Sequence, residues 1–218
     1  MRFAIVAFIL SFSLMPAVER VSVPIENDQV RVVDVTVQPH EKTRLHEHKI
    51  NRVMIYLDSG SQHFEYQGKS SADLSWRAGE PKWSPAAGMH TAEITSDRQI
   101  RIIEIELKKP AGGHSPVSSL DPVRIDPKHY RTEIENDQVR VVRVKIGPGE
   151  TAPMHEHSLN RVTVYLTPQD FQVTGADGKI VSATHKAGDV SWGNPSKHSE
   201  KNVGKQPFEV LMVELKRP

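Results

Sequence analysis

Hydrophobic and polar residues alternate with a period of two along much of the chain. Residues 103–107 and 211–215 both show this alternation, and residues 30–37 form a more continuously apolar run. Successive side chains of a β-strand point to opposite faces of a sheet, so the alternation predicts strands with one buried face. No segment after residue 20 carries the apolar stripe of an amphipathic helix. The pattern therefore predicts an all-β protein.

One segment of the sequence occurs twice, displaced by 109 residues. Residues 25–57 and 134–166 agree at twenty of thirty-three positions, and both begin with the unbroken run Ile-Glu-Asn-Asp-Gln-Val-Arg-Val-Val. Identity this dense indicates an internal duplication. Each unit is near the size at which a lone core is marginally stable, so we expect the two units to pack together as an intramolecular pseudo-dimer.

The duplication also sets the predicted domain boundaries. We expect a signal peptide over residues 1–20, a first domain over 21–110, a linker over 111–131 and a second domain over 132–218. The linker begins with glycines and contains three prolines, which predicts an extended rather than helical segment. Its apolar residues predict that it lies along a domain surface.

The N-terminal residues 3–15 are apolar apart from serine. This run is too short for a bilayer-spanning helix, which needs about 20 residues, but it fits the apolar region of a secretory signal. We therefore expect an exported protein, periplasmic or secreted, without membrane contact once the signal is removed. An uncleaved membrane anchor is the alternative.

Composition removes two further classes of function. The chain has no cysteine, so neither disulfides nor thiolate chemistry is available. Lys and Arg together number 28 and Asp and Glu 27, and no basic run is interleaved with aromatic residues. We therefore expect no nucleic-acid partner.

Each copy carries a His-x-His pair followed by a third histidine about forty residues later. The six residues are His46, His48, His90, His155, His157 and His198. Residues two apart on a strand point to the same face about 6.6 Å apart, so each pair can direct two imidazoles to one point. Three neutral imidazoles with an open coordination position suit a divalent transition metal such as Fe, Zn, Mn, Ni or Cu. The alternative is that they are polar residues on a sheet face.

The surroundings of these histidines resemble two known motifs. In the second copy Gly149 precedes the pair and Asn202 closes the later segment, whereas His40 and Ile94 stand at these positions in the first copy. The motifs, Gly-x5-His-x-His-x(3,4)-Glu-x6-Gly and Gly-x5-Pro-x-Gly-x2-His-x3-Asn, are those of the cupin family. The resemblance covers both units and implies two tandem jelly-roll barrels, or double-stranded β-helices, in one chain: a bicupin.

Both copies depart from the cupin motif at the glutamate that commonly binds the metal. Val53 and Val162 stand there, or Arg52 and Arg161 at the shorter spacing, and none of these side chains binds a cation. The resemblance therefore implies a three-histidine site, as in some cupins similar to thiol or diketone dioxygenases that use iron. Loss of the carboxylate should weaken metal affinity and leave a more positive site.

Three other pairs of polar residues recur near the histidines. Strand alternation predicts that Glu47 and Glu156 face away from the site. Glu41 and Glu150 either face water or bend inward as metal ligands, and Asn51 and Asn160 either hold a turn or offer a weak amide ligand.

The alternation further predicts which residues line each barrel. The expected inward residues are Val53, Ile55, Leu57, Val162, Val164 and Leu166. Tyr56 and Tyr165 are then expected on the outer surface, and Arg31 and Arg140 are interpreted as ion-pairing groups between the two units. The histidines without a counterpart are expected to be exposed: His40, His63, His114, His129 and His185.

Two hypotheses of function follow. In the first, at least one domain is a metalloenzyme, dioxygenase- or isomerase-like, that acts on a small molecule. In the second, the protein is an exported module that binds a small molecule or metal without turnover. Cupin-type barrels host both classes, so the fold does not choose between them. We also expect the first triad to bind metal more strongly, because the second copy has lost one residue between Gly188 and His198.

Overall fold

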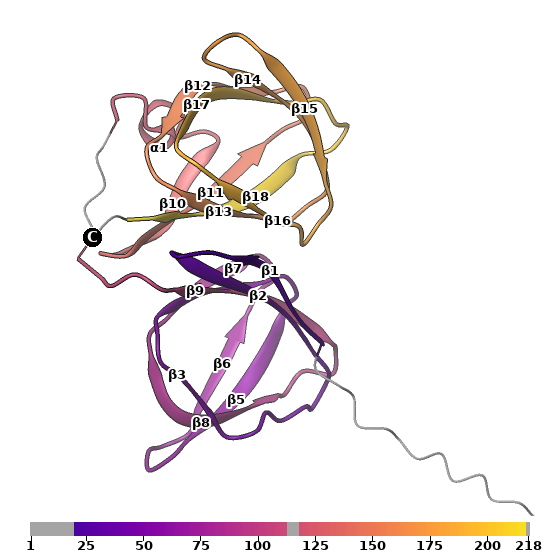
Figure 1. Cartoon of the computed structure of the whole chain (residues 1–218). Coiled ribbons are helices and arrows are strands. Elements are labelled where there is room, and N and C mark those ends of the chain that lie inside the picture. Colours follow the sequence, from indigo (N-terminus) through magenta and orange to yellow (C-terminus); the bar gives the residue numbers. More distant parts are fainter. Residues whose placement is uncertain (1–19, 113–117, 217–218) are drawn as a thin grey trace, which may run out of the picture.

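The computed structural model describes residues 20–112 and 118–216, which form two β-barrels in tandem (Figure 1). Nearly all of the regular structure is strand, as the alternation predicted, and each barrel combines a five-stranded with a four-stranded sheet. The predicted signal peptide, apart from Arg20, lies outside the described residues.

The first barrel has the sheet orders β1-β2-β9-β4-β7 and β3-β8-β5-β6, with antiparallel neighbours throughout. Its strands are β1 (Arg20–Glu26), β2 (Val30–Val37), β3 (His46–His48), β4 (Arg52–Tyr56), β5 (Gly60–Tyr66), β6 (Ala72–Trp76), β7 (Glu80–Ser84), β8 (Ala87–Ile94) and β9 (Ile100–Leu107).

The second barrel repeats this topology, with the sheet orders β10-β11-β18-β13-β16 and β12-β17-β14-β15. Its strands are β10 (Tyr130–Glu135), β11 (Val139–Ile146), β12 (Thr151–His157), β13 (Arg161–Tyr165), β14 (Gln169–Gly175), β15 (Ile180–His185), β16 (Val190–Gly193), β17 (Ser196–Asn202) and β18 (Phe208–Leu215). The duplication seen in the sequence therefore extends to every strand pairing.

The joint between the barrels contains a short helix, α1 (Pro122–Ile125), so the prediction of a wholly extended linker is wrong at this point. Asp121 caps the helix by accepting a hydrogen bond from the backbone N–H of Val123 at 3.1 Å, and proline fits its first turn because the missing N–H is not needed there. Val123 and Tyr130 pack against the second barrel, as expected of a joint lying on a domain surface. No helix among the described residues is long and apolar enough to span a membrane.

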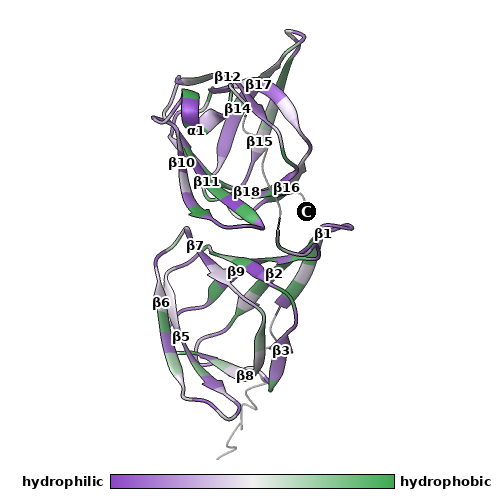
Figure 2. Ribbon diagram, turned by 90° about the vertical axis from the view of Figure 1, so that its left-hand side faces the viewer, coloured by the Kyte–Doolittle hydropathy of each residue, from purple (hydrophilic) through white to green (hydrophobic). Residues whose placement is uncertain are grey.

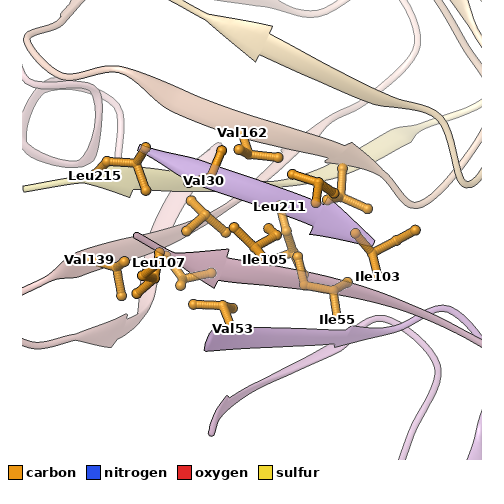
Figure 3. Packing of buried hydrophobic residues seen from close by; sticks show 14 residues of the cluster. Val30, Val53, Ile55, Ile103, Ile105, Leu107, Val139, Val162, Leu211 and Leu215 are labelled. Carbon is orange, nitrogen blue, oxygen red and sulfur yellow. The ribbon is translucent and has the colours of Figure 1, made fainter. Parts of the chain in front are cut away.

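The two five-stranded sheets face each other across the boundary between the barrels (Figures 1 and 2). Side chains from both sheets form one apolar cluster, and Figure 3 shows them interleaved. The buried members are Val30, Val32, Val53, Ile55, Ile103, Ile105, Leu107, Val139, Val141, Val162, Val164, Leu211, Val213 and Leu215. At about 25 cal/mol per Å² of apolar surface, burial of these side chains makes the boundary a major source of stability.

This packing overturns the predicted lining of the barrels. Val53, Ile55, Val162 and Val164, with the partly buried Leu57 and Leu166, pack against the opposite barrel instead of lining the interior. Tyr56 and Tyr165, expected on the outside, are buried with the interior residues of their own barrels. The alternation correctly identified which side chains share a face. It assigned the faces wrongly because both faces of these sheets are buried.

Two arginines link the barrels by donating to the carbonyls of two glycines that the duplication relates, Gly79 and Gly188. Arg101 donates to the carbonyl of Gly188 at 3.1 Å, and Arg143 donates to the carbonyl of Gly79 at 2.7 Å. Arg101 also forms a two-pronged pair with Asp34 on the adjacent strand. The equivalent cross-strand pair of the second barrel has the two charges in opposite places. There the arginine, Arg143, is on β11 and the carboxylate, Glu209, is on β18.

Replacing Gly188 with alanine should weaken this link. Gly188 has φ +83°, and an added Cβ would lie 2.1 Å from Nη1 of Arg101, so the guanidinium must leave both Asp34 and the carbonyl. Gly178→Ala is the matched control, because its φ is +79° and its Cβ would meet nothing within 4 Å. Urea unfolding should show Gly188→Ala less stable than the control by about 1 to 2 kcal/mol. Equal losses would mean that the arginine link contributes nothing.

Candidate metal centres

The first triad lies on two neighbouring strands of the four-stranded sheet. His46 and His48 extend from β3, and His90 on β8 is the register partner of His46. The ring centroids are 4.6 to 5.3 Å apart, and the Nε2 atoms of His46 and His48 are 3.1 Å apart. The Nδ1–H groups of His46 and His90 donate to the carbonyls of Arg44 and Gly88 at 2.7 and 2.8 Å. This fixes the tautomer that leaves their Nε2 lone pairs free.

The second triad has the same arrangement and is more enclosed. His155 and His157 extend from β12, and His198 on β17 pairs with His155. Ring centroids are 4.5 to 5.4 Å apart, and the Nε2 atoms of His155 and His157 are again 3.1 Å apart. His155 donates from Nδ1 to the carbonyl of Pro153 at 2.8 Å, while Nδ1 of His157 lies 3.2 Å from Oε1 of Glu214.

The structure thus brings the six predicted histidines together as two groups of three. Within each group the candidate ligand atoms lie within 4.8 Å of one another. Nitrogens that share one ion with bonds of about 2.0 to 2.2 Å must lie about 3 to 3.5 Å apart, which the Nε2 pairs satisfy. Binding of metal by these residues remains a prediction.

The shorter loop in the second copy does not displace its third histidine. His198 keeps the strand register of His90, and its distance from the paired imidazoles matches that in the first triad. The extra residue of the first copy is taken up by a register shift in β8 between the partners of His46 and His48, and β17 pairs with His155 and His157 without this shift. Loop length therefore gives no physical reason for the first triad to bind metal better.

Burial lowers the pKa values of five of the six triad imidazoles. It lowers the pKa of His48 to about 3, with smaller contributions from Arg52 and the other two imidazoles. In the second barrel burial lowers the pKa of His155 to about 4 and that of His198 to about 3. The pKa values of His90 and His157 are lowered for the same reason. Neutral imidazoles present the lone pairs that a transition metal needs.

Arginine stands in each barrel where the cupin glutamate would be. Arg52 is buried, and its Nη1 lies 2.8 Å from both Nε2 of His48 and Oε2 of Glu104. Arg161 instead donates to the carbonyl of Asn194 at 2.8 Å and to Oγ of Ser196 at 3.1 Å. The first guanidinium therefore crowds the paired histidine, whereas the second is held by groups outside the triad.

Carboxylates on the last strand of each barrel were missed as site residues. Glu214 of β18 is fully buried and contacts both His157 and Arg140, the latter at 2.6 Å. In the first barrel Glu104 and Glu106 of β9 lie within reach of a common ion with His48. The sequence signal was present as glutamates alternating with apolar residues, but that pattern also describes a strand with one face in water.

Arg31 and Arg140 lie inside the barrels, so their assignment to the boundary between the units is wrong. Arg31 pairs with Glu106 at 3.2 Å, and Arg140 pairs with Glu214 and with Asp121 at 2.6 and 2.5 Å. Because strand alternation places Arg31 opposite to Val30 and Val32, it faces the interior when those valines face the other barrel.

A tyrosine and a glutamate distinguish the second site. The hydroxyl of Tyr130 lies 3.3 Å from Nε2 of His155 and 3.4 Å from Oε2 of Glu200. The register gives Val21 and Ala92 as their counterparts in the first barrel. Glu200 lines the second cavity, and enclosure by the barrel raises its pKa to about 7. It can therefore hold or release a proton near neutral pH.

The remaining polar residues serve the scaffold. Glu41 and Glu150 accept backbone N–H groups at 2.9 and 2.8 Å and so hold turns. Asn51 donates to Gln138 of the second barrel. His129 was expected to be exposed but is buried between Asp126 and Glu150. His114 lies outside the described residues, and the other histidines without a counterpart, His40, His63 and His185, are exposed or half-buried.

Each triad opens onto a cavity inside its barrel. The first cavity has a volume of about 890 Å³ and is lined by aromatic residues including Tyr56 and Phe64. The second is smaller, about 360 Å³, and is bordered by His157, His198 and Phe171. The first can accept a larger molecule, and the second only a small one.

Comparisons with known proteins agree with this architecture. No protein-family model matches the chain, and no curated protein matches its sequence. AerE from Microcystis aeruginosa matches with a TM-score of 0.67 over 94% of this chain and 96% of its own, at 12% identity. Bacillus subtilis oxalate decarboxylase, which has Mn(II) centers, matches with a TM-score of 0.62 over 87% of this chain and 69% of its own, at 15% identity. Both are bicupin proteins, and this chain has the bicupin fold that its motifs implied.

The metal-free protein should lose stability as the pH falls from 7.5 to 5.0. The pKa of an unfolded histidine is about 6.5, above the lowered values of the five triad imidazoles, so the unfolded state takes up more protons in this range. Glu200 acts in the opposite sense because its folded pKa is raised, but it is one group against five. Urea midpoints of chelator-treated protein measure the effect, and a midpoint that rises on acidification would contradict the assignment.

Proposed function

We propose that the protein is a metal-dependent bicupin that acts on a small molecule, with one transition-metal site in each barrel. The observation that carries the proposal is the convergence of three imidazoles at the edge of an internal cavity, twice in one chain. The Nδ1 contacts of three of these imidazoles to backbone carbonyls, and of His157 to Glu214, hold the rings in place before a metal arrives.

The residues around each triad fit such a group. In the second barrel His155, His157 and His198 would hold the metal, and Glu214 orients His157 through its Nδ1. A bound metal supplies a Lewis acid or an oxygen activator. Manganese is supported by the Mn(II) centers of the oxalate decarboxylase neighbour, beside Fe, Zn, Ni and Cu.

The second barrel has a group for proton transfer beside its triad. Glu200 can exchange a proton near neutral pH, and Tyr130 connects it to the triad through contacts of 3.3 and 3.4 Å. An isomerase or decarboxylase reaction needs such a proton donor or acceptor beside its substrate.

A binding role without turnover is the second candidate, and it fits the first barrel. Arg52 contacts His48 and Glu104, so a metal must displace a guanidinium before it can occupy the site. We therefore infer that the second triad binds metal more tightly, in the reverse order to that expected from loop length. Export remains a proposal that depends on the apolar run at residues 3–15.

Metal content tests the proposal. His46→Ala and His155→Ala should each remove the metal of one barrel, leaving about half of the total, and wild type should release the metal of the first barrel at the lower chelator concentration. His63→Ala is the control, because this histidine contacts Asp73 and belongs to neither triad. Elemental analysis after equilibration with Mn(II), Fe(II) or Zn(II) measures the result. Full metal content in either triad variant would refute the assignment for that barrel.

We also propose that the barrels stabilise each other as an intramolecular pseudo-dimer. A chain of residues 118–218 keeps α1 and β10 but exposes the apolar face that carries Val139 and Leu211. It should therefore self-associate, or unfold at a lower temperature than the full chain. Sedimentation and thermal unfolding measure this, and a monomer as stable as the full protein would contradict it.

A further inference from the structure

We propose that the second barrel binds a small carboxylate through Arg161, beside the metal site, and that the first barrel does not. The inference deepens the function proposed above, and it rests on that function only for the role of the metal. Its basis is a difference between the barrels in the partners of two equivalent arginines.

Arg52 and Arg161 occupy the same position in the duplicated sheet. Arg52 is paired in register with Glu106 of β9, and Arg161 with Glu214 of β18. Both side chains line the cavity of their own barrel. The two guanidinium groups therefore start from the same backbone geometry, so any difference in what they bind comes from their neighbours.

The first arginine has an internal carboxylate partner. Nη1 of Arg52 lies 2.8 Å from Oε2 of Glu104. The residue that corresponds to Glu104 in the second barrel is Met212, because Glu104 pairs with Met54 and Met212 pairs with Thr163 at equivalent positions. The second barrel has an apolar side chain where the first has the neutralising charge.

Arg161 has no carboxylate within 4 Å among residues 20–112 and 118–216. It donates to the carbonyl of Asn194 and to the hydroxyl of Ser196, both neutral groups. Glu214, its register partner, is already bonded to Arg140 and contacts His157. Burial lowers the pKa of Arg161, and Glu214 and Glu200 oppose this only from beyond ion-pair distance, so the half-buried guanidinium has no directly bonded anion.

The size and lining of the cavity indicate which class of anion would bind. A guanidinium fork matches the two oxygens of a carboxylate. The volume of about 360 Å³ admits only a small molecule, and Phe171, Val173 and Val210 offer apolar contact to its body. Glu200 on the same wall disfavours a second full negative charge, so a carboxylate suits the site better than a phosphate dianion.

Calorimetric titration of the full chain with the monoanions acetate, glycolate and lactate tests the inference, at constant ionic strength and with inorganic phosphate titrated in parallel. Wild type should bind at least one of the carboxylates with a stoichiometry of one per chain and bind phosphate at least tenfold more weakly. Arg161→Gln should weaken carboxylate binding at least tenfold. No carboxylate binding, equal binding by Arg161→Gln or equal binding of phosphate would overturn the inference.

Exchanging the neighbours provides a sharper test. Met212→Glu should place a carboxylate beside Arg161 and weaken binding at least tenfold, whereas the neutral control Met212→Gln should stay within about threefold of wild type. Glu104→Met should free Arg52 and raise the stoichiometry from one to two. Thermal unfolding identifies any variant that fails to fold, and Arg161→Gln then decides. A stoichiometry that stays at one in folded Glu104→Met would contradict the explanation that Glu104 keeps Arg52 from binding a carboxylate.

Metal content, measured on the same samples, separates this inference from the proposed function. Carboxylate binding in protein that takes up no metal would support the anion site and refute the metal function. Metal uptake without carboxylate binding would refute the anion site and leave the metal function standing.

Discussion

The inner strands of each five-stranded sheet are buried on both faces, and much of the rest of the structure depends on this constraint. One face packs on the other barrel through the shared apolar cluster, and the other face closes the cavity of its own barrel. Strands β2, β4, β9, β13 and β18 contain no exposed residue, so a charge on them lies out of bulk water. Every charged residue on these strands must therefore find a partner inside the molecule or remain at a site with a use for the charge.

The polar groups of the interior follow from that requirement. Arg31 with Glu106, Arg140 with Glu214 and Arg52 with Glu104 are pairs between neighbouring strands, and the pairs lie close to the triads. The same network that satisfies the buried charges also orients the imidazoles, because Glu214 contacts His157. Stability of the sheet and geometry of the site are in this way two results of one set of contacts.

Duplication gave the two barrels the same backbone and the same histidines, and substitution then separated their electrostatics. The first cavity is large, and its arginine is neutralised by Glu104. The second is small, is lined by Glu200, which contacts Tyr130, and has Met212 where the first has a carboxylate. A few side chains on equivalent strands are enough to give the two cavities different electrostatics, because interactions between buried groups are weakly screened.

The sequence by itself determined the class of fold, the duplication and the six histidines that converge. These features are local: a period of two fixes strands, and a His-x-His pair fixes two side chains on one face whatever surrounds it. The direction of each face was decided only by the tertiary structure. When both faces of a strand are buried, period-two alternation does not tell which face points into the barrel. Val53 therefore packs against the other barrel and Tyr56 faces the interior, the reverse of the expectation. The same limit hid Glu214, whose neighbours His157 and Arg140 are 57 and 74 residues distant in the chain and meet it only when the strands pair.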